Sequence, residues 1–434
     1  MSMRLAVYGT GYLGATHAAC MAELGHDVIG VEIDPSKLAK LRAGELPFFE
    51  PSLTELLQAQ LGNGRLQFTD SYAETANWAD AHFICVGTPQ KKGEFGADIS
   101  YVMTVVETLA PLLSGDTLII GKSTVPVGTA VRLAEVAQAL APDVTVEICW
   151  NPEFLREGHA VEDTLHPDRL VVGVEAGGQA EAVTREIYAP IVDEGVPFLV
   201  TNLPTAELVK VSANAFLATK ISFINAIADV CEAADADVEA VADAIGHDPR
   251  IGRQFLNAGL GFGGGCLPKD IRAFMARAGE LGAGSALTFL REVDTINMRR
   301  RTRMVELARH ACSNFIGARV AILGAAFKPE SDDVRDSPAL NVAGQIQLQG
   351  AAVTVYDPQA MDNSRKLFPT LDYATSALDA CRGADAILVL TEWSEFTALT
   401  PQAVGMVTEG RNIIDGRQCL KRSVWESAGW TYTR

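Results

Sequence analysis

Apolar runs of the length of β-strands alternate with helix-length segments over residues 3–150. The strand-like runs are RLAVYG (4–9), DVIGVEI (27–33), AHFICVG (81–87), TLIIGKS (117–123) and VTVEICWN (144–151). This alternation is typical of a doubly wound sheet of parallel strands with helices on its faces. The sequence therefore predicts an α/β domain over the first part of the chain.

The same alternation returns near the C-terminus. RVAILG (319–324), AVTVYD (352–357), AILVLT (386–391) and NIID (412–415) have the pattern of strands in a second, smaller parallel sheet. The two parts also contain similar sequences, since WADAHFICVG (78–87) resembles RGADAILVLT (382–391). We therefore expect two related α/β domains.

Strand signals vanish from about residue 203 to 314. Residues 206–244 and 286–312 are rich in helix formers, with apolar positions at helical spacing. The predicted fold is two Rossmann-like, doubly wound parallel-sheet domains joined by a central helical domain with a long connecting helix. Its expected boundaries are 1–202, 203–314 and 315–434, with a substrate expected between the outer domains.

A glycine motif, GTGYLG, follows the first predicted strand directly and opens a helical pattern. Gly9 permits a tight turn, Gly11 lets the backbone approach a pyrophosphate, and Gly14 allows close packing of helix on strand. Glu32, and as second choice Asp34, stand at the end of the next strand, where a carboxylate binds a ribose 2′-OH and repels a 2′-phosphate. The pattern predicts an NAD site rather than an NADP site.

Composition narrows the possible partners. The chain has 434 residues, a formal net charge of -18 and a pI near 4.9, which argues against nucleic acid or an anionic membrane as a partner. We recognise no signal peptide and no run of about 18 apolar residues. The eight cysteines lack paired CxxC spacing, so we expect reduced thiols in the cytoplasm, without disulfides and without a metal site.

The stretch GLGFGGGCLPKD (259–270) places Cys266 behind five glycines and just before a predicted helix, with Pro268 in its first turn. A helix N-terminus and a nearby lysine favour a thiolate, and glycines let the backbone come close to a ligand. The simpler alternative is a buried cysteine in a tight turn. Beside an NAD site, a nucleophilic thiol indicates aldehyde oxidation through a thiohemiacetal and a thioester.

Other polar residues suit that chemistry. Lys210 and Asn214 are four residues apart in a helical pattern, so they share one helix face and could bind an alkoxide. Asp270 could hold or deprotonate a water molecule. Three further candidates follow strand-like runs at the ligand edge of a sheet, although each could equally be structural: Thr124, Glu153 and Glu157.

The C-terminal sheet begins with GAAFKP (324–329) and lacks the glycine fingerprint, so we expect it to bind something other than a dinucleotide. Lys328, Arg335 and Arg417 are cations beside its predicted strand ends. They suit a nucleotide diphosphate, and the alternative is that they are solvated surface charges.

These motifs together resemble the UDP-glucose/GDP-mannose dehydrogenase family, the nucleotide-sugar dehydrogenases, and within it the UDP-glucose branch. The resemblance runs in order from about residue 3 to 420 and is carried by GTGYLG, ICVGTP, KSTVPVGT, NPEFLREG, ELVKVSANAFLATKISFINA, HDPRIG, FLNAGLGFGGGCLPKD, FKPESDDVRDSPAL and IDGR. It implies oxidation of a primary alcohol to a carboxylate in two steps with two NAD. The family often has GGSC where this chain has GGGC, and we expect that loss of a serine hydroxyl to matter little.

The resemblance also implies site roles. Cys266 is similar to the family nucleophile, and Lys210 is similar to the residue that stabilises the alkoxide and the oxyanion. Asn214 would share the pocket of Lys210. Asp270 and Thr124 would position a water molecule, and Glu153 would act in the hydrolytic step. Arg250 resembles an arginine that reaches the neighbouring subunit's substrate, which implies a homodimer built on the helical domain. The implied cofactor contacts are Gly9, Gly11, Leu13, Gly14, Glu32, Lys37, Thr88, Thr124, Glu157, Lys269 and Arg335. The implied substrate contacts are Glu153, Phe154, Leu155, Glu157, Lys210, Asn214, Arg250, Phe255, Leu256, Asn257, Ala258, Gly259, Gly263, Lys328 and Arg417.

Three alternatives stay open at this point. A sister enzyme acting on GDP-mannose or on a UDP-N-acetylhexosamine would use the same cysteine chemistry. A two-electron hydroxyacid dehydrogenase would need no thiol. A non-enzymatic NAD-sensing protein would not need the combination of Lys210, Asn214, Cys266 and Asp270.

Overall fold

The computed structural model describes residues 2–434, which form two compact units. The first unit comprises the chain up to residue 213 together with 272–282. The second comprises residues 214–271 and 283–434. Each unit is built around its own sheet.

The first unit contains an eight-stranded sheet in the order β3-β2-β1-β4-β5-β6-β7-β8. Its strands are parallel except where β6 meets β7, which pair antiparallel through Trp150 and Gly173. The strands are β1 (Arg4–Tyr8), β2 (Asp27–Val31), β3 (Leu66–Thr69), β4 (Ala81–Ile84), β5 (Thr117–Gly121), β6 (Val146–Trp150), β7 (Leu170–Gly173) and β8 (Phe198–Thr201). Since the strand order reverses at β1, the loops after β1 and β4 border the point where α/β sheets bind ligands.

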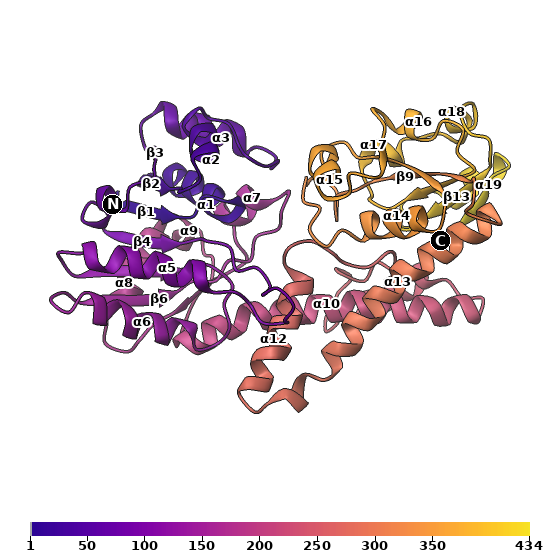
Figure 1. The fold of residues 1–434 in the computed structure, drawn as a ribbon. Coiled ribbons are helices and arrows are strands. Elements are labelled where there is room, and N and C mark those ends of the chain that lie inside the picture. The colour runs from indigo at the N-terminus through magenta and orange to yellow at the C-terminus, as the bar shows by residue number, and fades with distance from the viewer. Residues whose placement is uncertain (1) are drawn as a thin grey trace. The chain divides into compact units, whose positions relative to one another are not determined.

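Helices cover both faces of this sheet (Figure 1). Successive residues of β1 point to opposite faces, so Leu5 and Val7 enter one apolar cluster while Ala6 and Tyr8 enter another. The helices are α1 (Tyr12–Glu23), α2 (Pro35–Arg42), α3 (Leu53–Gly62), α4 (Tyr72–Ala76), α5 (Ser100–Leu109), η1 (Ala110–Leu112), α6 (Thr129–Leu140), α7 (Ala160–Leu165), α8 (Ala180–Ile187) and α9 (Ala189–Asp193).

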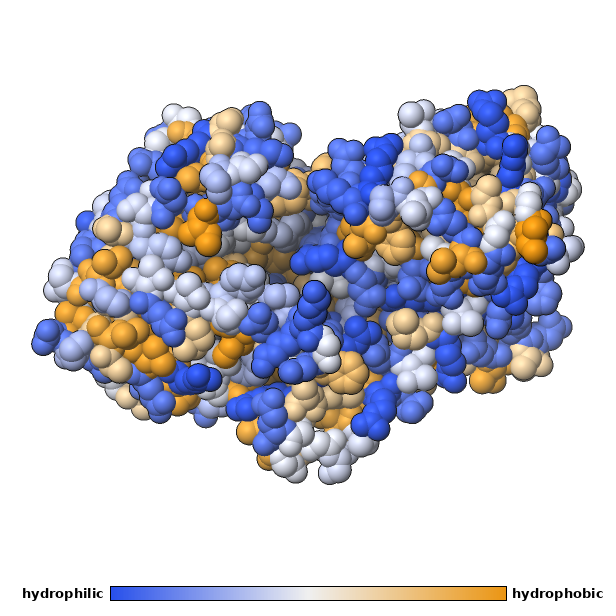
Figure 2. Space-filling view, in the orientation of Figure 1, coloured by the Kyte–Doolittle hydropathy of each residue, from blue (hydrophilic) through white to orange (hydrophobic). Residues whose placement is uncertain are grey.

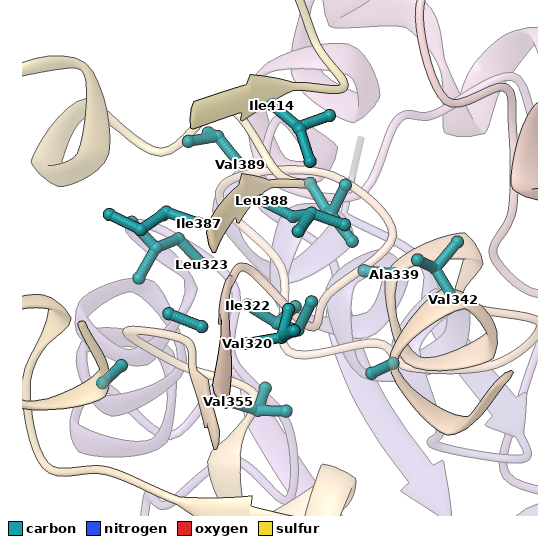
Figure 3. Close-up of a cluster of buried hydrophobic side chains, with 14 of the residues drawn as sticks. Val320, Ile322, Leu323, Ala339, Val342, Val355, Ile387, Leu388, Val389 and Ile414 are labelled. Carbon is teal, nitrogen blue, oxygen red and sulfur yellow. The ribbon is translucent and has the colours of Figure 1, made fainter. Parts of the chain in front are cut away.

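The second unit contains a six-stranded parallel sheet in the order β11-β10-β9-β12-β13-β14. Ile322, Val355, Leu388 and Ile414, from four of these strands, lie in one buried cluster (Figure 3). The strands are β9 (Arg319–Leu323), β10 (Ala352–Tyr356), β11 (Asp372–Tyr373), β12 (Ala386–Val389), β13 (Asn412–Asp415) and β14 (Thr431–Thr433).

Helix α13 packs against α14 and against β12 and β13 of this second sheet. This contact ties the helical segment before residue 313 to the core of the second unit. The helices here are α11 (Val238–Gly246), η2 (Gly284–Leu287), α13 (Phe289–Cys312), α14 (Pro338–Leu348), α15 (Met361–Leu367), α16 (Ala377–Ala380), α17 (Ser394–Thr397), α18 (Pro401–Gly405) and α19 (Arg422–Ser427).

Two helices contribute residues to both units: α10 (Leu203–Ala233), with 31 residues, and α12 (Leu267–Glu280). By length and composition alone α10 could cross a membrane, a test that core helices of soluble proteins also pass. The two parallel sheets, the helical segment and the long α10 confirm the predicted fold class.

All nine strands named from the sequence are present, and five that the sequence analysis did not name complete the sheets: β3, β7, β8, β11 and β14. The predicted strands of the first sheet are parallel, and the antiparallel pair joins β6 to β7, a strand outside the predicted set. On the face drawn in Figure 2, hydrophilic residues predominate and hydrophobic ones are scattered among them in small groups, as the acidic composition suggests.

Candidate active site

The GTGYLG turn has three glycines with three different tasks. Gly9 has φ +83°, a left-handed conformation that L side chains avoid. A Cβ on Gly14 would lie 1.9 Å from the carbonyl oxygen of Gly9, so only glycine lets α1 pack this closely. A Cβ on Gly11 would meet nothing within 4 Å, and no side chain caps α1 at that residue. The open backbone and helix N-terminus at Gly11 suit a pyrophosphate.

The two carboxylates after β2 have different tasks. Glu32 is buried; it accepts a hydrogen bond from the Thr10 hydroxyl at 3.0 Å and one from the backbone N–H of Asp34 at 3.0 Å. Asp34 instead caps α2 by accepting from the N–H groups of Ser36 and Lys37. Because Asp34 caps the helix, Glu32 is the stronger candidate to bind the ribose 2′-OH, as the sequence indicated.

Glu153, in the loop after β6, pairs with Lys210 on α10. The Lys210 Nζ lies 3.0 Å from the Glu153 carboxylate, and both side chains are largely buried. The Nζ also lies 5.5 Å from the centre of the Phe154 ring, whose face is covered by the Arg169 guanidinium at 3.9 Å. The structure thus joins two residues singled out in the sequence, and adds Arg169, which the sequence gave no signal for.

Thr124 lies in the loop between β5 and α6, and its carbonyl accepts a hydrogen bond from the Thr88 hydroxyl at 2.7 Å. This bond connects the ICVGTP and KSTVPVGT motifs. Where this loop meets α6, the N–H groups of Gly128, the N-cap residue, and Ala130, in the first turn, donate to the carboxylate of Glu207, one turn before Lys210 on α10. Burial raises the pKa of Glu207 to about 6 against these hydrogen bonds.

Glu50 holds the loop that carries Glu157. It is buried and accepts hydrogen bonds from the N–H groups of Gly158 at 2.6 Å and Ala160 at 2.7 Å, and from the hydroxyl of Tyr12 in the glycine motif. A carboxylate in PFFEP gave no sequence signal, because its partners lie far along the chain. Its three bonds tie the NPEFLREG loop to α1.

Cys266 is exposed and precedes α12 directly, as predicted. Its carbonyl accepts the N–H of Asp270 at 2.9 Å, which closes the first turn of the helix. The Asp270 carboxylate is buried and accepts from Asn214 Nδ2 at 2.7 Å and from Lys269 Nζ at 2.5 Å. Three further predicted site residues, Asn214, Lys269 and Asp270, therefore lie together, with Asn214 one helical turn beyond Lys210 on α10.

The loop that leads to Cys266 is held by side chains that sequence reasoning missed. Asn225 Oδ1 accepts from the N–H of Gly259 at 2.8 Å, and Arg300 donates to the Gly259 carbonyl at 2.9 Å. Asn297 binds both the N–H and the carbonyl of Phe262. All three side chains are buried polar groups on helices. Their burial becomes visible only in the folded chain, so the sequence gave no signal for them.

Phe255, at the start of this loop, has φ +63°, the left-handed region that bulky residues rarely adopt. At the other end, a Cβ on Gly265 would lie 2.4 Å from the guanidinium carbon of Arg335. The absence of a side chain at residue 265 therefore makes room for the Arg335 guanidinium, which also pairs with Asp333 at 2.8 Å. This cation lies against the residue that precedes Cys266.

The remaining predicted cations differ in their surroundings. Arg417 donates to the carbonyls of Leu390, Gly261 and Phe327 at 2.8–3.0 Å, so its guanidinium holds three segments of the second unit together. Lys328 Nζ lies 5.6 Å from the centre of the Phe327 ring. Arg250 is exposed and pairs with Asp248 at 2.6 Å.

Sequence comparison covers both units. The NAD binding domain of the UDP-glucose/GDP-mannose dehydrogenase family matches residues 3–192, its central domain 204–299 and its UDP binding domain 321–422. The chain belongs to the UDP-glucose/GDP-mannose dehydrogenase family. It is an oxidoreductase, and its first matched domain is the one that binds NAD.

Individual sequences and solved structures are similar to this chain over almost its whole length. A UDP-glucose 6-dehydrogenase of Rhizobium meliloti (strain 1021) is 41% identical over 99% of this chain and 98% of its own length. The structure of a UDP-glucose dehydrogenase from Pyrobaculum islandicum superimposes with a TM-score of 0.92 at 35% identity, over 100% of this chain and 98% of that one. A UDP-D-ManNAc dehydrogenase from Pyrococcus horikoshii gives 0.86 at 28% identity, over 99% of this chain and 98% of that one.

Proposed function

We propose that the chain oxidises the C6 alcohol of UDP-glucose to the carboxylate of UDP-glucuronate. The proposal rests on one observation above others: an exposed cysteine opens a helix whose first turn holds a buried aspartate bonded to a lysine and an asparagine. A dehydrogenase that stopped at the carbonyl would need no such thiol. The identity of about 41% to a UDP-glucose 6-dehydrogenase supports the UDP-glucose branch.

The residues of GTGYLG and the strand end at Glu32 would hold NAD, because the open backbone at Gly11 and the carboxylate at Glu32 fit a pyrophosphate and a ribose. NAD, when bound, accepts one hydride in each of two oxidations. The other cofactor contacts we propose are Leu13, Lys37, Thr88, Thr124, Glu157, Lys269 and Arg335.

The first oxidation needs a base and a stabiliser for the alkoxide. Lys210 would stabilise the negative oxygen, and Glu153 orients its ammonium through the 3.0 Å ion pair. Asp270 would accept the hydroxyl proton through a water molecule, and Asn214 holds its carboxylate. The product of this step is an aldehyde.

The second oxidation uses the thiol. The Cys266 thiolate adds to the aldehyde carbon and the resulting oxygen takes a proton, giving a thiohemiacetal; loss of a hydride and that proton leaves a thioester. Water, positioned by Asp270, Thr124 and Glu153, then adds to the thioester and expels the thiolate. The balanced reaction is UDP-glucose, two NAD⁺ and water giving UDP-glucuronate, two NADH and three protons.

The nucleotide sugar would be bound by cations and by the glycine-rich loop. Lys328 and Arg417 would face the UDP moiety, and Arg250 would reach the substrate of a neighbouring subunit. The loop contacts we propose are Phe255, Leu256, Asn257, Ala258, Gly259 and Gly263, with Glu153, Phe154, Leu155 and Glu157 from the loop after β6. We keep the three-domain division at 1–202, 203–314 and 315–434, which the three family matches support.

We propose a homodimer built on the helical segment, in the cytoplasm. Phe216, Phe223 and Val230 are 66%, 49% and 62% exposed and recur every seven residues on α10. Side chains seven apart lie on one face of a helix, so these three form an exposed apolar row. A second copy of α10 would cover it.

Initial rates with UDP-glucose, GDP-mannose and UDP-N-acetylglucosamine test the proposed substrate. We expect kcat/KM for UDP-glucose to exceed the others by about 100-fold, since sugar hydroxyls are recognised by buried polar groups. A Cys266→Ala variant should form no acid. Preference for another sugar nucleotide would move the substrate, and acid formation by Cys266→Ala would overturn the thiol mechanism.

A further inference from the structure

A lysine that no proposed step uses is buried beneath the Glu153–Lys210 pair. Lys122 follows β5 directly and is only 7% exposed. Its Nζ donates to Asn151 Oδ1 at 2.8 Å and to the Tyr188 hydroxyl at 3.2 Å, and Tyr188 donates to the same Asn151 oxygen at 2.8 Å. Both partners are neutral. A buried ammonium with neutral partners is costly, so it needs a reason to be there.

The position of Lys122 in the sheet connects two loops. It lies two residues before Thr124 in the loop after β5, and Asn151 lies two residues before Glu153 in the loop after β6. Asn151 has no freedom to turn, because its N–H donates to the Gly121 carbonyl at 2.8 Å and its Nδ2 to the Val171 carbonyl at 2.9 Å. The ammonium binds the remaining polar atom of this side chain, Oδ1, and so ties the loop after β5 to the base of the loop that presents Glu153.

Electrostatics connects Lys122 to the same pair. Burial lowers the pKa of Lys122 to about 8, while the charge of Glu153 raises it and that of Lys210 lowers it. The ionisable groups that face Lys122 are Cys85 after β4, Cys149 on β6, Tyr188 after α8, His17 on α1, Glu153 and Lys210.

We propose that Lys122 is a positioning residue for the oxidation chemistry: it holds Asn151, and through it the loop that carries Glu153, in the place that orients Lys210. This inference rests on the proposed function of Glu153 and Lys210. It assigns Lys122, Asn151 and Tyr188 to one polar network under the site.

A double-mutant cycle in the full-length enzyme tests the inference. Lys122→Met keeps most of the length of the side chain and removes the charge, and we expect kcat to fall about tenfold with both KM values within about twofold. On a Glu153→Gln background the same change should have almost no further effect, because the network would act through a carboxylate that is already gone.

Lys366→Met, at an exposed position on α15, is the matched control and should leave kcat and both KM values unchanged. If Lys122→Met does not fold, Tyr188→Phe carries the same cycle, since it removes one bond to the ammonium and one to Asn151. Equal loss of kcat with and without Glu153 would reduce Lys122 to a structural role and overturn the inference. Failure of the wild type to oxidise UDP-glucose would refute the proposed function instead, and the cycle would then be measured with the nucleotide sugar that is oxidised.

Discussion

The Nζ atom of Lys210 lies 3.0 Å from the carboxylate of Glu153, although the two residues come from a helix and from a strand-end loop. Lys210 is 5% exposed, so its ammonium depends on this carboxylate for compensation of its charge. The pair gives the first unit a cation held in one orientation, which is what stabilisation of an alkoxide requires.

Removing the carboxylate should slow hydrolysis more than hydride transfer. For Glu153→Gln we expect kcat to fall about 100-fold, because a water molecule loses its activating group. Rapid mixing should then show a burst of NADH followed by a slow steady state. Glu186→Gln, which changes an exposed glutamate on α8, is the control and should match the wild type. A steady-state rate within twofold of wild type would remove Glu153 from the hydrolytic step.

A side chain at residue 265 should disturb the cysteine. A Cβ there would lie 2.4 Å from the Arg335 guanidinium, so Gly265→Ala must displace that cation from beside Cys266. We expect alkylation of Cys266 by iodoacetamide at pH 7 to slow about threefold, since a nearby cation favours the thiolate. Gly62→Ala, where an added Cβ would meet nothing within 4 Å, is the control. Unchanged alkylation would show that Arg335 does not influence the thiol.

The first unit should lose stability in acid through a buried histidine. His82 on β4 is fully buried and bonded to the Tyr8 hydroxyl at 3.1 Å, and burial lowers its pKa from 6.5 to about 4. Because the unfolded chain binds the proton more readily, stability is present above pH 6.5 and is lost as the pH falls towards 4. Between pH 6.5 and 4, this difference in the pKa of His82 lowers the free energy of unfolding by about 3 kcal/mol.

Urea unfolding at pH 7, 6 and 5 measures this effect. His82→Gln should flatten the dependence of unfolding free energy on pH, at some cost in stability at pH 7. His310→Gln, at an exposed position on α13, should leave the slope unchanged. An unaltered slope in His82→Gln would assign the acid sensitivity to other groups, of which His17, also buried with a lowered pKa, is the first candidate.

A charge in the apolar row of α10 should dissociate the proposed dimer. Phe223 is the middle residue of the row, 49% exposed, so Phe223→Glu places a carboxylate at the centre of the covered face. We expect light scattering to give a dimer for the wild type and a monomer for the variant, with little change in thermal stability of the subunit. Leu348→Glu, at a position 87% exposed on α14, should remain dimeric. A monomeric wild type would contradict the proposal.

The sequence could predict those elements whose pattern is contained in a few neighbouring residues. Nine strands, the glycine turn and the helix after Cys266 follow from apolar runs and glycine spacing over a few residues. Strands β7 and β8 were not predicted, although LVVG and FLVT are as long as the predicted AILV and NIID; β8 is partly exposed at the edge of its sheet. The antiparallel pairing of Trp150 with Gly173 depends on a connection that no local pattern reveals.

The candidate site could also be predicted only where a residue stands out in its local sequence. Cys266, Lys210 and Asp270 stand out because each is reactive and lies at a recognisable position. Lys122 and Glu50 do not, since a lysine after a strand or a glutamate in a loop is usually exposed, and their burial follows from residues more than 25 positions away. Long-range partners of this kind become visible when the chain is folded.

The amount of NADH formed from limiting UDP-glucose, with NAD in excess, decides whether one substrate molecule is oxidised twice. We expect two NADH for each UDP-glucose, together with one UDP-glucuronate, because Cys266 carries the aldehyde into a second oxidation. One NADH for each UDP-glucose, with the aldehyde as product, would contradict this expectation.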